Sequence, residues 1–123
     1  MIDPKDIDRL AKVVLKYQTA ETEKEKDEIF DKEYCEIDAI RFKSPEKLWA
    51  IILRVHALTN DPEVLAVLSA GLLEDLLAQF PYQSIDWVEE QARKDPRFKK
   101  LLRGVWQNLM PDEIWERLQK LRE

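Results

Sequence analysis

The sequence has few of the residues that build disulfides, metal centres and tight turns. It contains one cysteine, Cys35, one histidine, His56, and two glycines, Gly71 and Gly104. A single cysteine cannot form an intramolecular disulfide. One cysteine and one histidine together supply too few ligands for a zinc site. No Asn-Gly or Asp-Gly pair separates alternating apolar residues, so the sequence does not predict β-hairpins. We therefore expect no metal, no other cofactor and a reducing compartment.

Long apolar runs are also missing. No stretch approaches the roughly 18 apolar residues of a membrane-spanning helix. The first residues, Met-Ile-Asp-Pro-Lys-Asp, do not resemble a signal peptide. These patterns predict a cytoplasmic protein, with a bacterium as the default source and no membrane association. Glycine-rich phosphate loops and paired nucleophile–base motifs are absent too, so no catalytic residue is assigned and a non-catalytic protein is favoured.

Prolines are the most informative residues that are present. Of the six, five stand where a helix should begin, because proline at the first helical position loses no hydrogen bond. Asp3, Ser44, Asp61 and Asp95 each precede one of them as a candidate N-cap. Pro81 is expected instead to end a helix, with Ser84 capping the next one. With the apolar periodicity, these signals predict helices over residues 4–17, 21–41, 45–58, 62–80, 84–94, 96–108 and 111–121.

The predicted fold is all-α, with about seven short helices in a single domain over residues 1–123. Residues 1–43 supply the N-terminal helices and residues 44–123 the helical core. A compact bundle and stacked helical hairpins of the HEAT type both fit, since no fixed sequence repeat is present. The helix expected over residues 21–41 could divide near Tyr34 and Cys35. The helix over residues 96–108 should bury Val105 and either Trp106 or Leu109.

Charge is unevenly distributed along the chain, whose net charge is −5. Residues 21–38 hold nine acidic and three basic side chains, and Glu23, Glu25 and Glu28 are the candidate partner-binding residues there. From Arg93 to Arg103 the balance reverses, with six basic residues and one acidic. Both segments are typical of solvated helix faces, and either could meet a charged partner.

Glu74 and Asp75 interrupt the most apolar predicted helix, where a buried charge needs a partner. We expect one of them to accept a hydrogen bond from an arginine between Arg93 and Arg103; a groove floored by both carboxylates is the alternative. Gly71 and Gly104 lie inside predicted helices, and the sequence predicts that their two helices cross closely there.

Trp106, Gln107 and Asn108 lie near the end of a predicted helix, just before Met110 and Pro111. The four tryptophans could all belong to the core. A tryptophan flanked by amides and a methionine is equally typical of a binding hot spot. Trp106, Gln107 and Asn108 are therefore candidate binding residues, together with Glu74, Asp75 and Arg97.

Residues 65–121 carry a longer pattern. It runs through Leu68-Ser69-Ala70-Gly71-Leu72-Leu73-Glu74-Asp75-Leu76-Leu77, Val88-Glu89-Glu90-Gln91-Ala92-Arg93-Lys94-Asp95-Pro96-Arg97-Phe98-Lys99, Gly104-Val105-Trp106-Gln107 and Met110-Pro111-Asp112-Glu113-Ile114-Trp115. This stretch resembles a family of uncharacterised bacterial helical domains. Leu72 departs from the family's proline, which implies a straighter helix here. The resemblance implies no activity, but it draws attention to its matching polar positions, Asp95 among them.

These observations favour a non-catalytic protein-interaction module, immunity- or antitoxin-like, whose partner is another protein. Two alternatives stay open. The Arg93–Arg103 segment, expected as one basic helix, could bind nucleic acid, or the Glu74/Asp75 groove could belong to an enzyme. The sequence does not identify the partner or the oligomeric state.

Overall fold

The computed structural model describes residues 2–122, and every regular element within that range is helical. The predicted all-α fold is therefore confirmed. The chain divides into two compact units, residues 1–64 and 65–123, with the division inside helix α5 (Pro62–Leu68). The sequence predicted N-terminal helices over residues 1–43 and a helical core over residues 44–123, which is a different division of the chain. The expectation of a single domain stays a prediction.

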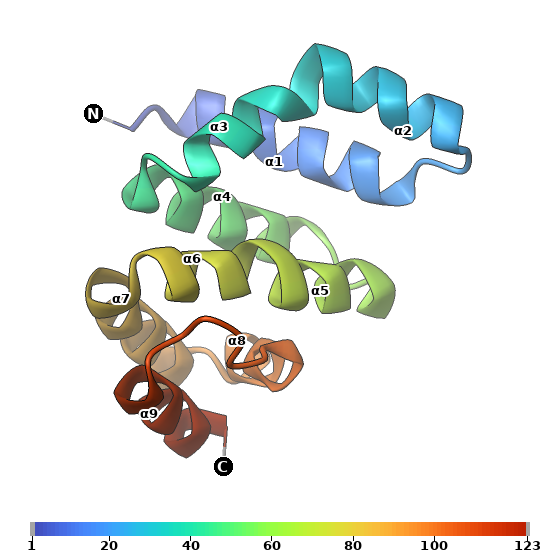
Figure 1. Cartoon of the computed structure of the whole chain (residues 1–123). Helices are drawn as coiled ribbons and strands as arrows, with labels where there is room; N and C mark the ends of the chain where they lie inside the picture. Colours follow the sequence, from blue (N-terminus) through green and yellow to red (C-terminus); the bar gives the residue numbers. More distant parts are fainter. Residues whose placement is uncertain (1, 123) are drawn as a thin grey trace. The chain divides into compact units, whose positions relative to one another are not determined.

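The first unit is built around α1 (Pro4–Thr19) and α4 (Pro45–Leu58), which pack side by side (Figure 1). Between them in sequence come α2 (Glu23–Ile29), a π-helical turn (Phe30–Tyr34) and α3 (Cys35–Arg41). α2 and the turn pack on α1, and α3 packs on α4. The side chains buried most completely in these elements are Leu10, Ala11, Ile37, Leu48, Ile51, Ile52 and Val55. The periodic apolar residues of the helix predicted over residues 4–17 thus face a core.

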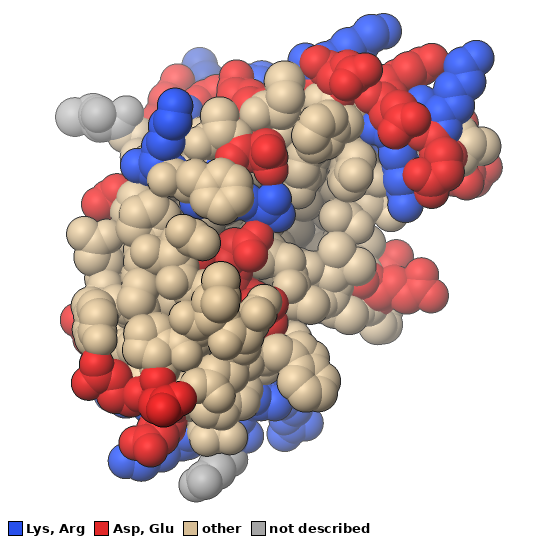
Figure 2. Space-filling view, in the orientation of Figure 1, with Lys and Arg blue, Asp and Glu red and all other residues tan. Residues whose placement is uncertain are grey.

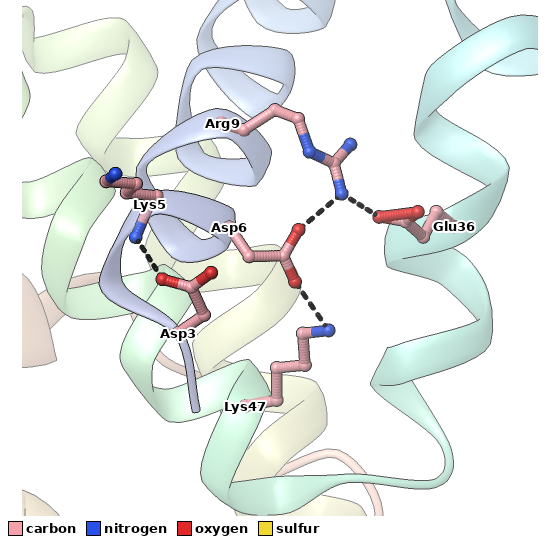
Figure 3. Close-up of polar contacts among 6 residues, drawn as sticks. All are labelled: Asp3, Lys5, Asp6, Arg9, Glu36 and Lys47. Carbon is pink, nitrogen blue, oxygen red and sulfur yellow. Dashed lines mark hydrogen bonds and ion pairs between the residues drawn. The ribbon is translucent and has the colours of Figure 1, made fainter. Parts of the chain in front are cut away.

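Ion pairs join the three helices α1, α3 and α4 at one edge of this unit (Figure 3). Arg9 donates from Nη2 to Asp6 at 2.5 Å and to Glu36 of α3 at 2.7 Å, while Lys47 of α4 lies 2.8 Å from the other oxygen of Asp6. Asp8 is similarly placed between Lys12 and Arg54, each at 2.8 Å. These contacts link α1 to its neighbours through partly exposed charged side chains.

The predicted helix over residues 21–41 is continuous but irregular. It does not divide into two separate helices near Tyr34 and Cys35: the π-helical turn ends at the first of these residues and α3 begins at the second, and both keep right-handed helical backbone. The start at Glu23 is capped: Thr22 Oγ1 accepts from the Glu25 N–H at 3.1 Å, and Glu25 Oε2 accepts from the Glu21 N–H at 3.1 Å. Capping thus supports a first turn that has no apolar anchor.

The second unit contains the end of α5, a π-helical turn (Ser69–Leu73), α6 (Glu74–Gln79), α7 (Pro81–Lys94), α8 (Pro96–Leu101), a 3₁₀ turn (Leu102–Gly104) and α9 (Asp112–Arg122). α7 packs against α6, α8 and α9, and the 3₁₀ turn packs against both the π-helical turn and α9 (Figure 1). The buried side chains of this unit include Leu73, Leu76, Leu77, Ile85, Val88, Phe98, Leu102, Ile114 and Leu118.

Several predicted boundaries in this unit are wrong. Pro81 starts α7 rather than only ending the helix before it, and Ser84 lies inside α7 with its hydroxyl donating to the Phe80 carbonyl at 2.7 Å. The helix expected from Pro96 to Asn108 ends at Leu101, followed by the 3₁₀ turn. The cations from Arg93 to Arg103 are therefore spread over α7, α8 and the 3₁₀ turn and do not form one basic helix.

The two glycines differ. A Cβ on Gly104 would lie 2.7 Å from Ser69 Cβ, so here the 3₁₀ turn approaches the helix of residues 62–79 as closely as predicted. Ser69 in turn donates from Oγ to the Leu101 carbonyl at 2.7 Å. A Cβ on Gly71 would meet nothing within 4 Å. The prediction of a close crossing is right for Gly104 and wrong for Gly71.

Candidate partner-binding site

The segment between the 3₁₀ turn and α9, residues 105–111, forms a loop that we call the tryptophan loop. It begins where Gly104 ends the helical region. Asn108 adopts a φ of 46°, a left-handed conformation that asparagine tolerates better than most residues. Four consecutive apolar or amide side chains, Trp106 to Leu109, are thus presented on non-helical backbone.

Glu74 holds this loop from α6. Its side chain is 8% exposed, and Oε1 accepts a hydrogen bond from the Trp106 backbone N–H at 2.8 Å. Oε2 accepts from Asn108 Nδ2 at 3.4 Å. A buried carboxylate must be hydrogen-bonded to be tolerated, so the loop and the carboxylate stabilise one another. The partners expected for Glu74 were arginines; the loop takes their place. For Asp75 the arginine contact stays a prediction.

Further hydrogen bonds hold part of the loop backbone and the end of the 3₁₀ turn before it. Arg122 donates to the Val105 carbonyl at 3.2 Å and to the Arg103 carbonyl at 3.0 Å. Gln107 Nε2 donates to the Met110 carbonyl at 3.2 Å and to Asp112 Oδ1 at 2.6 Å, and the Met110 N–H donates to the Gln107 carbonyl at 2.8 Å. The loop backbone is therefore anchored by hydrogen bonds from α6, α9 and its own side chains.

Two large apolar side chains of this anchored loop point outward. Trp106 is 73% exposed and Leu109 is 77% exposed, whereas Val105 and Met110 on either side are buried. The expectation that Trp106 or Leu109 lies in the core is wrong, because the helix that would have turned one of them inward ends before the loop. The hot-spot interpretation of Trp106 stays a prediction.

A pocket of about 500 Å³ opens beside Trp106. Its lining residues are Val105, Trp106, Trp115, Gln119 and Arg122. The Arg122 guanidinium carbon lies 5.3 Å from the centre of the Trp115 ring, within the range of a cation–π contact. An aromatic wall and a cation therefore meet in one depression.

Most other candidate residues of this unit lie outside the pocket lining. Gln107 and Asn108 belong to the tryptophan loop and anchor it, as described above. Asp75 and Arg97 are half-buried in α6 and α8. The structure thus brings Glu74, Trp106, Gln107 and Asn108 together by direct hydrogen bonds or shared backbone, a contact that the sequence did not predict.

The acidic candidates lie in the first unit. Glu23, Glu25 and Glu28 are all exposed on α2, where Figure 2 shows red side chains gathered with blue lysines among them. Glu25 has the additional role of capping the helix start. These three exposed residues of α2 are called the α2 surface below; Glu25 and Glu28 lie toward one side of the helix and Glu23 toward the other.

Sequence reasoning missed Leu109, Trp115, Gln119 and Arg122 as site residues. The signals that could have found the loop were present: Gly104 near a helix end, Asn108 as a residue tolerant of positive φ, and Pro111. Arg122 gave no such signal, because its two backbone acceptors lie 17 and 19 residues away in the chain.

Neither a metal site nor a membrane span is found between residues 2 and 122. No group of three or more His, Cys, Asp or Glu side chains in that range is placed to hold a metal ion. Each helix described is too short or too polar to cross a bilayer.

Comparison with known families finds one family that matches most of the chain. A family model described as a family of unknown function, DUF6869, matches residues 18–123. The chain belongs to this family. The match includes the tryptophan loop, Glu74 and the α2 surface, and it confirms the membership in an uncharacterised domain family that the sequence pattern predicted. No match was found among curated proteins or among solved structures.

Proposed function

We propose that this DUF6869 member is a non-catalytic protein-interaction module that binds a protein partner through the tryptophan loop. One observation carries the proposal: Trp106 and Leu109 are 73% and 77% exposed on a loop whose backbone is held by a buried carboxylate. Tryptophan is among the residues most enriched at binding hot spots, and an anchored loop loses little conformational entropy on binding.

The energetics support a binding role for the exposed side chains. Burying a leucine-sized side chain contributes roughly 1.5–3 kcal/mol, and both outward side chains of the loop forgo this gain. Meanwhile Glu74, Gln107 and Arg122 are all engaged in fixing the backbone that displays them. A partner that covers Trp106 and Leu109 would recover the missing burial without reordering the loop.

The source of the protein, its cellular location and the type of its interaction are proposed from the sequence. We propose a bacterial, cytoplasmic protein, supported by the single exposed cysteine, Cys35, and by the resemblance of residues 65–121. An immunity- or antitoxin-like role, in which the module covers a toxin, is the form of interaction that we favour for a small acidic protein of this kind.

Photo-cross-linking in the native cell tests the proposal. A photoreactive amino acid at position 109 should yield one dominant adduct with another protein, because Leu109 is outward-facing beside Trp106. The adduct should disappear when Trp106→Ala is added. The matched control places the same amino acid at Phe42, which is also exposed (55%) but lies in the first unit. The same adducts from both positions, or adducts unaffected by Trp106→Ala, would contradict the proposal.

The α2 surface is proposed as a second contact that accelerates encounter with basic groups of the partner. Exposed charges act over a Debye length of about 8 Å at physiological salt and change association rates more than affinity. Glu23→Lys with Glu28→Lys, leaving the capping Glu25 intact, should slow association with the cross-linked protein. An unchanged association rate would show that the α2 surface takes no part in binding.

A further inference from the structure

We propose that the pocket beside Trp106 binds a carboxylate side chain of the partner, so that the partner segment recognised is acidic and apolar in adjacent positions. This inference rests on the proposed function and specifies its chemistry. It is carried by Arg122, the charged residue among the described residues that line the pocket.

The geometry presents the guanidinium in a fixed orientation. Nη1 donates to the Val105 carbonyl and Nη2 to the Arg103 carbonyl, while the group lies 5.3 Å from the centre of the Trp115 ring. These contacts restrain the long side chain from three directions. A restrained guanidinium loses less entropy than a free one when an anion binds, because much of its side-chain freedom has been removed already.

The donors of Arg122 are not exhausted by these contacts. A guanidinium carries five N–H donors, and within the described chain two of them are used, both by neutral carbonyl oxygens. No carboxylate pairs with Arg122 among the ion pairs of the described residues, whereas Arg117 on the same helix is paired with Glu89 and Asp86. The pocket therefore offers an incompletely used cation to an incoming anion.

The remaining lining residues determine which side chain of the partner can bind next to the carboxylate. Val105, Trp106 and Trp115 are apolar or aromatic, and Gln119 adds an amide that can donate to a second carboxylate oxygen. The volume of about 500 Å³ is that of a site for one or two side chains, not for an extended chain. A glutamate or aspartate next to a leucine or an aromatic residue matches this combination of charge, shape and apolar wall.

A peptide selection tests this chemistry directly. A random peptide library displayed on phage is first depleted on the Trp106→Ala variant and then selected on the unmodified protein. The expected result is enrichment of sequences with Asp or Glu next to an apolar residue. Replacing that acid by its amide in the chosen peptide should weaken binding about tenfold, because the charged hydrogen bond is lost while the protein is unchanged.

Arg122 is tested in the same binding assay. Arg122→Gln should remove the preference for the acidic peptide over its amide form. Since Arg122 also supports the loop, Arg122→Lys is measured beside it: this variant keeps a charge but lacks the planar fork, and it should retain part of the preference. Equal affinity of the protein for acidic and amide peptides would overturn the inference, and so would a selection of basic sequences.

The two proposals fail in distinguishable ways. Peptides that bind through Trp106 but ignore Arg122 and carry no acid leave the proposed function standing and overturn this inference. A selection that yields no peptide dependent on Trp106 contradicts both, because the tryptophan loop would then not be a binding surface.

Discussion

Glu74 is the residue on which the proposed site depends most. It lies in an apolar helix, and its buried carboxylate accepts from the backbone of Trp106 and the side chain of Asn108. A charge in such a place is costly unless its partners are fixed, so the helix and the loop constrain one another. This coupling gives the residue a role in displaying Trp106 without any contact to a ligand.

Removing that carboxylate should loosen the loop. We expect Glu74→Ala to lower the free energy of unfolding by about 1–3 kcal/mol, because the Trp106 N–H would lose its acceptor. Denaturant unfolding measures this cost, and hydrogen exchange at the Trp106 amide should become faster. Glu90→Ala, which alters an exposed carboxylate on α7, is the control. An unchanged exchange rate at Trp106 would show that Glu74 does not hold the loop.

Replacing each of the two glycines by alanine should change the free energy of unfolding in opposite directions. Gly104→Ala would bring a Cβ to 2.7 Å from Ser69 Cβ, and Ser69 is tied to the Leu101 carbonyl, so we expect a loss of roughly 1–3 kcal/mol in unfolding free energy. Gly71→Ala meets open space and should stabilise the helix by about 0.5–1 kcal/mol. Thermal unfolding of both variants compares them; equal effects would contradict the packing described.

Among the elements, α2 depends on its cap. We expect Glu25→Lys to destabilise the start of α2 by about 0.5–2 kcal/mol, because it removes the acceptor of the Glu21 N–H. Glu23→Lys places the same charge in the first turn but leaves that acceptor intact, and so isolates the effect of charge near the helix dipole. Circular dichroism and amide exchange at Glu21 distinguish the two variants. Similar exchange at Glu21 in both would argue against the cap.

The ion pairs joining α1 to α3 and α4 should respond to acid. Hydrogen bonds from Lys47 and then Arg9 lower the pKa of Asp6, and bonds from Lys12 and then Arg54 lower the pKa of Asp8. Because each pKa is lower folded than unfolded, their contribution to stability is present above the unfolded value of about 3.9 and is lost as the pH falls through the folded value.

Substitution should flatten that pH dependence. We expect Asp6→Asn with Asp8→Asn to reduce the melting temperature at neutral pH and to show a smaller further loss below about pH 4 than the unmodified protein. Asp27→Asn, an exposed change on α2, is the control and should keep the original acid response. Parallel pH curves for the double variant and the unmodified protein would rule out this role for the two aspartates.

The starts of the helices were the feature of the fold that the sequence predicted best. Pro4, Pro45, Pro62 and Pro96 each begin a helix as predicted, and Asp3, Asp61 and Asp95 accept the expected capping bonds at 3.0 Å. The end of α8 was not predicted, because the apolar spacing of residues 98–105 continues past it. In the structure α8 ends at Leu101, and the 3₁₀ turn that follows closes at Gly104, where Ser69 leaves no room for a Cβ.

At the scale of the whole chain, family membership spans both units. The matched residues 18–123 omit most of α1, although Leu10 and Ala11 are fully buried in the core of the first unit. The sequence pattern named Glu74, Trp106, Gln107 and Asn108 as separate candidates and did not predict that they meet. Their hydrogen bonds, the outward direction of Trp106 and the role of Arg122 were not accessible from the sequence, since each depends on contacts between residues far apart in the chain.

The most direct test of the central claim is the affinity of the cross-linked partner, measured by calorimetry, for three variants. We expect Trp106→Ala and Leu109→Ala each to weaken binding by at least about 1–2 kcal/mol, roughly five- to thirtyfold, with melting temperatures close to that of the unmodified protein. Phe42→Ala, which removes a large exposed apolar side chain (55%) in the first unit, should leave affinity unchanged. Unchanged affinity in the Trp106 and Leu109 variants would contradict the assignment of the tryptophan loop as the binding surface.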